Sequence, residues 1–85
     1  MIIKDFELPF APDTYIGFVS GFVIEAGAFA SKIEICFEDK CLDGKSFLSL
    51  LYASTTPRTF FTMRVEGEDE QQAIEQLTAY IDRFR

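Results

Sequence analysis

Hydrophobic and polar residues alternate in four stretches of the chain, and this alternation predicts four β-strands. Residues 2–8, 32–37 and 59–66 show the two-residue period of strands with one buried face. A short return strand at 40–42 follows a tight turn at residues 38–39. The residues expected to face inward are Ile2, Phe6, Leu8, Ile33, Ile35, Phe37, Leu42, Phe61, Met63 and Val65.

Between these strands, apolar residues at three- and four-residue steps predict three helices. The first runs from about Ile16 to Ala30 and is capped by Asp13 or Thr14. The second covers residues 47–52 and is opened by Ser46. The third follows Gly67 and has negative charge in its first turn, where the helix dipole favours it. Its expected buried face comprises Ala73, Ile74, Leu77, Tyr80, Ile81 and Phe84.

The element order βαββαβα predicts an α+β fold, in which three helices cover one face of a four-stranded antiparallel sheet. A chain of 85 residues is expected to form a single domain over 1–85. Such a small domain needs a dense core. The composition supplies one, since 48% of the residues are hydrophobic and 10 are Phe.

Charge and the amino-terminal sequence narrow the classes of partner. Eight basic and 14 acidic side chains give a net charge of −6, which repels nucleic acid and anionic lipid. The first residues do not resemble a signal or transit peptide. The most apolar stretch, residues 15–30, is interrupted by polar residues and glycines and is short for a membrane span. We therefore expect a cytoplasmic protein with no nucleic-acid or membrane partner.

The chain contains no His, which excludes imidazole general-base catalysis, His metal ligands and a phosphohistidine intermediate. Cys36 and Cys41 are too few for a zinc site without His, and we expect them on the uncovered sheet face. A redox pair is one interpretation of them; reduced thiols are the interpretation we favour. The acidic residues 66–70 complement the last helix dipole better than they suit a cation. No metal, cofactor or enzymatic activity is predicted.

Two segments carry a resemblance to a known family. They are residues 44–51, Gly-Lys-Ser-Phe-Leu-Ser-Leu-Leu, and residues 65–77 at the last strand-to-helix junction, and the spacing between them needs no gap. With the element order, they resemble HPr, the histidine-containing phosphocarrier of the bacterial sugar phosphotransferase system. The resemblance covers essentially the whole chain and implies an HPr-like open-faced β-sandwich that binds other proteins.

The chain departs from this family at the phosphate-carrying loop. The family's Gly-(Ile/Leu)-His-Ala-Arg-Pro core corresponds to residues 13–18, so that the carrier His falls on Tyr15 and the phosphate-binding Arg on Gly17. A phenol forms too stable a phosphoester to replace imidazole in a transfer reaction. The resemblance therefore implies a degenerate member without phosphocarrier activity, similar in this respect to the catabolite-repression HPr-like proteins.

Ser46 matches a serine that a kinase phosphorylates in this family, and the phosphorylated product binds a transcriptional regulator. The resemblance thus implies an HPr kinase and a transcriptional regulator as partners. Phosphate at a helix start would meet free N–H groups, and Lys45 is adjacent. Serine is also favoured at this position as a helix cap alone. The two roles are compatible.

Apolar side chains on two helices form the predicted partner-binding surface. Phe47, Leu48 and Leu51 give the short helix an apolar exterior, although Leu50 and one of Phe47 or Leu51 are expected to turn into the core. Phe18 and Phe22 give the first helix a second apolar face, which either packs inside or docks a partner, including a second copy of the chain. The alternative function is an interaction or homodimerising protein of this fold outside the phosphotransferase system.

Overall fold

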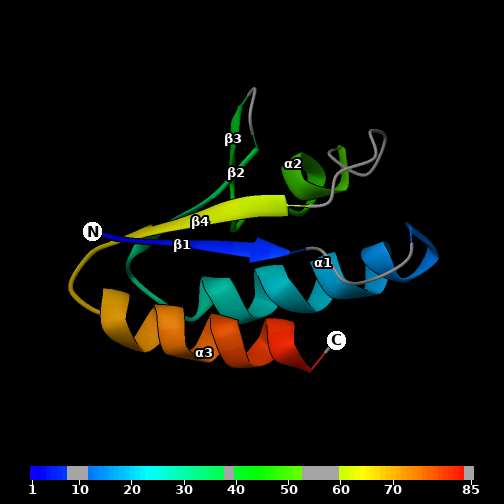
Figure 1. Ribbon diagram of the computed structural model, residues 1–85. Helices are drawn as coiled ribbons and strands as arrows, with labels where there is room; N and C mark the ends of the chain where they lie inside the picture. Colours follow the sequence, from blue (N-terminus) through cyan, green and yellow to red (C-terminus); the bar gives the residue numbers. More distant parts are fainter. Residues whose placement is uncertain (8–11, 38–39, 53–59, 84–85) are drawn as a thin grey trace.

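The computed structural model describes residues 1–7, 12–37, 40–52 and 60–83, and within them it confirms the predicted element order (Figure 1). Four strands and three helices follow one another in the order βαββαβα along the described chain. Their bounds are β1 (Ile2–Glu7), α1 (Pro12–Gly27), β2 (Lys32–Cys36), β3 (Cys41–Asp43), α2 (Phe47–Tyr52), β4 (Phe60–Glu66) and α3 (Glu70–Asp82). The expected turn at 38–39, Leu8 and Phe84 lie outside the described residues.

The strands form one antiparallel sheet in the order β1-β4-β2-β3. β4 lies between β1 and β2, so its inward residues are the most completely covered, and Met63 and Val65 are fully buried. Alternation predicted the buried face correctly in β2 and β4. No described helix covers the other face, which exposes Ile3 and Phe60. Figure 1 shows α1 and α3 lying together against one side of the sheet, with α2 beside the β2–β3 end.

Helix α1 starts earlier than predicted. It begins at Pro12 and ends at Gly27, whereas the sequence pattern predicted residues 16–30. Asp13 and Thr14 therefore lie inside the helix and not before its first residue, where the sequence pattern had placed them. Proline suits the first helical turn because its missing N–H has no partner to lose there. At the other end, the N–H groups of Ala28 and Phe29 bond to carbonyls three residues earlier, which closes the helix.

Close contact between α1 and α3 fixes which side of α1 is buried. The Phe18 and Phe22 rings lie 5.6 and 6.2 Å from the Tyr80 ring, measured between centroids. The Tyr80 hydroxyl donates a hydrogen bond to the Phe18 carbonyl at 2.7 Å. Gly21 makes this approach feasible, because a Cβ there would lie 2.9 Å from the Tyr80 Cζ. Tyr80 thus occupies space that only a glycine on α1 leaves open.

Asp69 ties the start of α3 to the turn after α1. Its carboxylate accepts hydrogen bonds from the Ala30 N–H at 2.8 Å, the Ser31 N–H at 2.9 Å and the Ser31 hydroxyl. These donors stabilise the charged form, so they lower the pKa of Asp69, with the Ser31 hydroxyl contributing most. Asp69 makes no side-chain cap of its own helix. Its role is a long-range crosslink, which the helix-dipole interpretation of the acidic segment missed.

Candidate functional site

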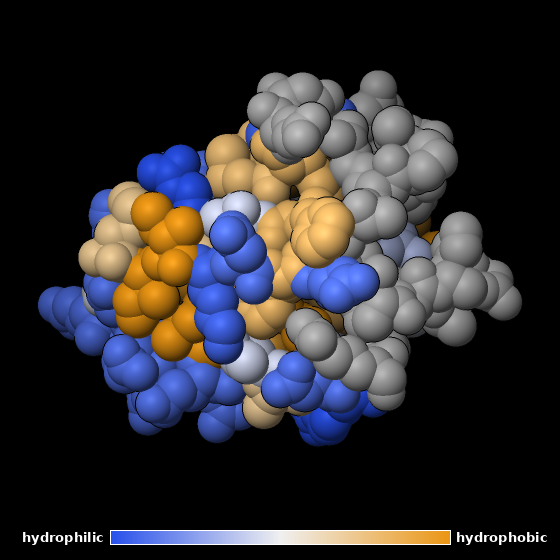
Figure 2. Space-filling view, viewed as in Figure 1, coloured by the Kyte–Doolittle hydropathy of each residue, from blue (hydrophilic) through white to orange (hydrophobic). Residues whose placement is uncertain are grey.

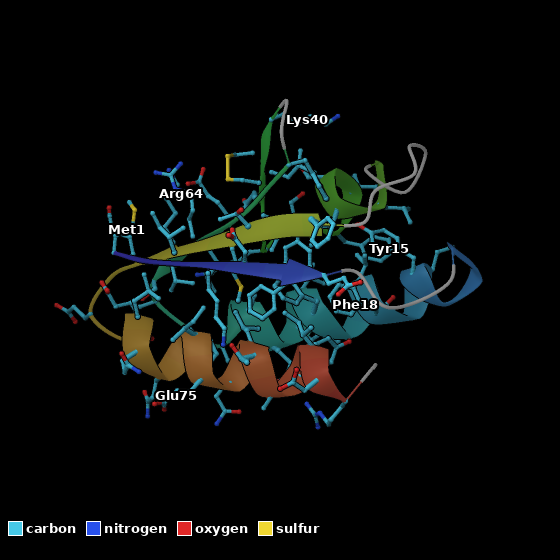
Figure 3. The ribbon with its side chains drawn as sticks, viewed as in Figure 1. Met1, Tyr15, Phe18, Lys40, Arg64 and Glu75 are labelled. Carbon is cyan, nitrogen blue, oxygen red and sulfur yellow. A yellow bond between two sulfur atoms is a disulfide. The ribbon has the colours of Figure 1, made fainter. Side chains whose placement is uncertain are left out.

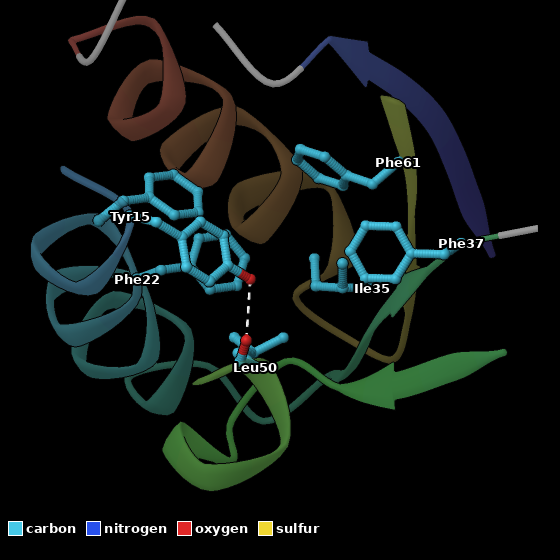
Figure 4. A pocket seen from close by; sticks show the side chains of 7 residues that line it. Tyr15, Phe22, Ile35, Phe37, Leu50 and Phe61 are labelled. Atoms are coloured by element: carbon cyan, nitrogen blue, oxygen red, sulfur yellow. Dashed lines mark hydrogen bonds between the residues drawn. The ribbon is translucent and has the colours of Figure 1, made fainter. Parts of the chain in front are cut away.

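Tyr15 connects α1 to α2. It lies in the first turns of α1, and its hydroxyl donates a hydrogen bond of 2.9 Å to the Leu50 carbonyl (Figure 4). Leu50 is in the last turn of α2, where carbonyl groups have no partner within the helix. Burial raises the pKa of the Tyr15 phenol above its usual value of 10.0. At neutral pH the hydroxyl therefore keeps its proton and serves as a donor.

Gly17 lies on the solvent side of α1, and no described side chain lies within contact distance of a Cβ placed there. Because the helix begins at Pro12, the N–H groups of Ile16, Gly17 and Phe18 bond to carbonyls four residues earlier. The sequence predicted that the helix begins at about Ile16, which leaves the N–H groups of its first turn without partners. That prediction is wrong, since residues 13–18 are all helical and these three amides are already bonded.

Ser46 caps α2, as the sequence predicted. Its Oγ accepts a hydrogen bond from the Ser49 N–H at 3.3 Å, and its own N–H donates to the Asp43 carbonyl at 3.1 Å. The neighbouring Lys45 ammonium donates to the Phe29 carbonyl at 2.6 Å, so its position is set by the turn after α1. The Lys45 side chain thus links the start of α2 to the turn after α1.

Exposed apolar residues lie on α1 and α2, but they are not all the predicted ones. Leu48 is 76% exposed and Phe47 37%, whereas Leu50 is buried and Leu51 is half-buried. The prediction of an exposed patch at Phe18 and Phe22 is wrong, because these residues are 5% and 0% exposed.

The exposed isoleucines of α1 are Ile16 and Ile24, at 56% and 75%. This helix is apolar on almost every side, so periodicity alone did not distinguish the two faces. The signal that would have identified the buried side was Gly21, which sits within the stripe of Phe18 and Phe22 and permits a close neighbour.

Three concavities of different kinds lie on the described part of the chain. The one beside Tyr15 measures about 10 Å³ and is lined by Phe22, Ile35 and other apolar side chains, so it holds no more than a water-sized molecule (Figure 4). A groove of about 500 Å³ separates β1 from α3, near hydrophobic surface that Figure 2 shows at the level of β1. A third, of about 340 Å³, opens on the uncovered sheet face beside Cys36 and Thr62.

Comparison with known proteins places the chain in a family. The family described as "PTS HPr component phosphorylation site" matches residues 19–83. The phosphocarrier protein HPr of Haemophilus influenzae is 37% identical over 81 residues, covering 95% of both chains. The HPr-like protein Crh of Bacillus subtilis is 37% identical over 60 residues, covering 71% of both. This chain belongs to the HPr family.

Solved structures agree with the HPr fold. The structure of HPr-C-His from Thermoanaerobacter tengcongensis superposes with a TM-score of 0.86 at 23% identity, covering 96% of this chain and 92% of that one. The Crh structure from Bacillus subtilis has a TM-score of 0.68 at 33% identity and covers 78% and 76% of the two chains. The predicted α+β architecture is confirmed. The match to the family model begins at residue 19, after Tyr15 and Gly17, whereas the match to HPr of Haemophilus influenzae covers 95% of the chain.

Cys36 and Cys41 form a disulfide in this HPr-family chain, so the expectation of reduced thiols is wrong. The two residues are directly opposite in the β2–β3 pairing. The Phe37 N–H bonds to the Lys40 carbonyl, which makes Cys36 and Cys41 the next, non-hydrogen-bonded pair. Side chains of such pairs lie close together on one face, which suits a disulfide. Their predicted position on the uncovered face is confirmed, because Cys36 alternates with the inward Ile35.

No group of three or more His, Cys, Asp or Glu side chains within residues 1–7, 12–37, 40–52 and 60–83 is placed to hold a metal ion. None of the helices in those same ranges has both the length and the hydrophobicity to cross a membrane.

Proposed function

We propose that this chain is a regulatory, protein-binding member of the HPr family that carries no phosphoryl group on histidine and catalyses no reaction. One observation carries the proposal: the chain has no imidazole, and Tyr15 at the carrier position uses its hydroxyl to support α2. A phosphocarrier needs a nucleophilic nitrogen and donors that hold the phosphate. Gly17 has no cationic side chain to hold a phosphate, and its N–H cannot hold one because it is bonded within α1.

Phosphoryl transfer provides the direct test. The protein is incubated with enzyme I of the phosphotransferase system and labelled phosphoenolpyruvate, and HPr of Haemophilus influenzae serves as the positive control. We expect acid-labile label on the control and none on this chain. Acid-labile label on this chain would contradict the proposal, because it would show that a residue other than histidine carries a transferable phosphoryl group.

We further propose that phosphorylation of Ser46 switches partner binding, by analogy with the family resemblance around residues 44–51. The Ser46 side chain is partly exposed and bonds only to the Ser49 N–H among the contacts described above. A phosphate there would add negative charge between Lys45 and the apolar exterior of α2. Because the Lys45 ammonium already donates to Phe29, it has two remaining N–H donors for a phosphate.

An HPr kinase with ATP tests this switch, with mass spectrometry as the readout. We expect phosphate on wild type, none on Ser46→Ala, and unchanged uptake by the matched control Ser49→Ala. Loss of the cap should also cost Ser46→Ala about 1 kcal/mol of stability. Folding of each variant is therefore checked by circular dichroism first. Absence of phosphate on folded wild type would remove the switch while leaving the first proposal intact.

The partner-binding surface that we propose comprises Phe47, Leu48 and Leu51 on α2, with Lys45 at its margin and Ile16 and Ile24 of α1 in place of Phe18 and Phe22. Support comes from the exposure of Leu48 and Ile24, at 76% and 75%. We expect a transcriptional regulator to co-purify with the protein. This co-purification should depend on Leu48 but not on Phe60, which is exposed on the opposite face of the sheet. Equal dependence on both residues would contradict this surface.

The alternative proposal is a homodimer that works outside the phosphotransferase system. It is favoured by one relative, since Crh of Bacillus subtilis, whose solved chain is 33% identical to this one, forms a dimer with a swapped domain. Light scattering at high protein concentration tests it. A mass of one chain at every concentration would contradict the dimer and leave the regulatory proposal standing.

A further inference from the structure

The Cys36–Cys41 disulfide lies on the uncovered sheet face, away from α1 and α3 (Figure 3). A row of side chains crosses the sheet here from Asp5 on β1 through Thr62 on β4 to the two cysteines. The S–S bond joins β2 to β3, and β3 is one of the two edge strands of the sheet. The Cys36 sulfur therefore lies on the side of the central strand β4, and the Cys41 sulfur lies on the side of the sheet edge.

The two cysteines differ sharply in their surroundings. Cys36 is 9% exposed and lies next to Thr62 on the central strand, whereas Cys41 on the edge strand is exposed. Asp5 accepts a hydrogen bond from the Thr62 hydroxyl at 2.6 Å, which fixes a carboxylate on the Cys36 side of the row. The same carboxylate lines the concavity of about 340 Å³ beside Cys36.

Thiol–disulfide exchange proceeds by attack of a thiolate along the S–S axis, and access decides which sulfur is attacked. Approach to the Cys36 sulfur along that axis passes over Thr62 and Asp5, where the carboxylate repels an anionic nucleophile. Approach to the Cys41 sulfur comes from beyond β3, at the open edge of the sheet. Access therefore favours attack at Cys41.

We propose that Cys41 is a modification site at which a small thiol forms a mixed disulfide. The thiolate attacks the Cys41 Sγ, the Cys36 Sγ leaves as a thiolate, and that thiolate takes a proton from water. A second small thiolate then attacks the outer sulfur of the mixed disulfide and releases the Cys41 thiolate, which is protonated in turn. Two small thiols are oxidised to one disulfide, and the protein disulfide gains two electrons and two protons.

This site is independent of the proposed regulatory function, since it uses neither Tyr15 nor Ser46. Its structural effect is on β3, a strand of three residues that pairs with β2 at the edge of the sheet. Release of the disulfide removes the covalent link between β2 and β3 at the end of the pairing next to Phe37 and Lys40. The strand is then held by its pairing with β2, by the half-buried Leu42 and by the bond from the Gly44 N–H to the Ile33 carbonyl at 2.8 Å.

The sequence offers a simple readout, because Lys40 lies between the two cysteines. Protein purified without reductant is exposed to reduced glutathione, quenched in acid, alkylated with a maleimide and digested with trypsin. Cleavage after Lys32, Lys40 and Lys45 places Cys36 in residues 33–40 and Cys41 in residues 41–45. At early times we expect glutathione on 41–45 and maleimide on 33–40.

Three results would overturn the proposal. The first is glutathione on residues 33–40 in place of 41–45. The second is a pair of peptides that stay linked at every glutathione concentration, which would make the disulfide purely structural. The third is maleimide on both peptides before any reductant is added, which would show that no disulfide forms.

Two variants give a matched control that does not depend on the native disulfide. Cys36→Ser leaves only Cys41, and Cys41→Ser leaves only Cys36, so each lacks the crosslink equally. With oxidised glutathione we expect Cys36→Ser to form its adduct several-fold faster than Cys41→Ser does. Equal rates would contradict the assignment of Cys41. If either variant fails to fold, the peptide map of the wild-type protein still decides the question.

Discussion

Replacement of Tyr15 by phenylalanine removes one hydroxyl and leaves the packing of the ring unchanged. The hydroxyl donates to the Leu50 carbonyl at 2.9 Å, and α2 ends two residues after Leu50, so no N–H of that helix bonds to this carbonyl. A hydrogen bond of this kind contributes about 1 kcal/mol, and a carbonyl left partly buried without a donor adds to the loss. Because Tyr15 is only half-buried, a water molecule that bonds to the Leu50 carbonyl in the variant offsets part of this loss of stability. We expect Tyr15→Phe to lower the free energy of unfolding by about 1–2 kcal/mol.

Urea denaturation followed by circular dichroism at neutral pH measures this change, since the phenol is protonated there. For a domain of this size, each kcal/mol also corresponds to a shift of about 4–8 °C in Tm. Ser20→Ala is the matched control. Its hydroxyl bonds at 3.0 Å to the Ile16 carbonyl within α1, in an exposed position, so we expect a change within about 0.5 kcal/mol.

A local measurement separates this explanation from a general loss of packing. The Leu50 N–H bonds to the Ser46 carbonyl at 3.2 Å and reports on α2. Its hydrogen exchange should accelerate in Tyr15→Phe and stay unchanged in Ser20→Ala. Equal stability of the two variants would refute the reasoning. So would a destabilised Tyr15→Phe whose Leu50 amide exchanges as in wild type.

The other predictions concern pH, backbone packing and the disulfide. The lowered pKa of Asp69 means that its contribution to stability is present above its unfolded value of 3.8 and is lost as the pH falls through the folded pKa. The Tm difference between wild type and Asp69→Asn should therefore shrink on acidification from pH 7. A constant difference would contradict the stabilising role of the hydrogen bonds to Asp69. Gly21→Ala should cost about 1–3 kcal/mol in urea denaturation because its methyl group meets a packed ring. Gly17→Ala, in open space on the same helix, should stabilise by up to about 1 kcal/mol, and similar effects of the two would be inconsistent with this packing. Reduction of the disulfide, which closes a loop over a separation of 5 residues, should lower stability by about 2 kcal/mol, and an unchanged urea midpoint would argue against the crosslink.

Local sequence patterns were sufficient to predict the buried face of an element where only one of its faces is apolar. In β4, Phe61, Met63 and Val65 alternate with residues that face outward, so the two-residue period identified the buried face directly. In α3 the apolar residues form one stripe, and its described members are all buried. The cap at Ser46 depends on contacts within three residues and was equally visible. The absence of His, which excludes histidine phosphorylation, needs no structure at all.

Only the tertiary structure decided the features that depend on distant neighbours. The apolar surface of α1 has no single stripe, so the contact of Tyr80 with Gly21 determined that Phe18 and Phe22 are buried and Ile24 is exposed. The partners of Tyr15 and Asp69 lie 35 and about 38 residues away in the chain, beyond the reach of any local period. The tight turn predicted at 38–39 already implied that Cys36 and Cys41 are neighbours across two strands, but the sequence did not decide whether they form a disulfide. Periodicity reports which residues share a face, whereas packing selects the face that is covered.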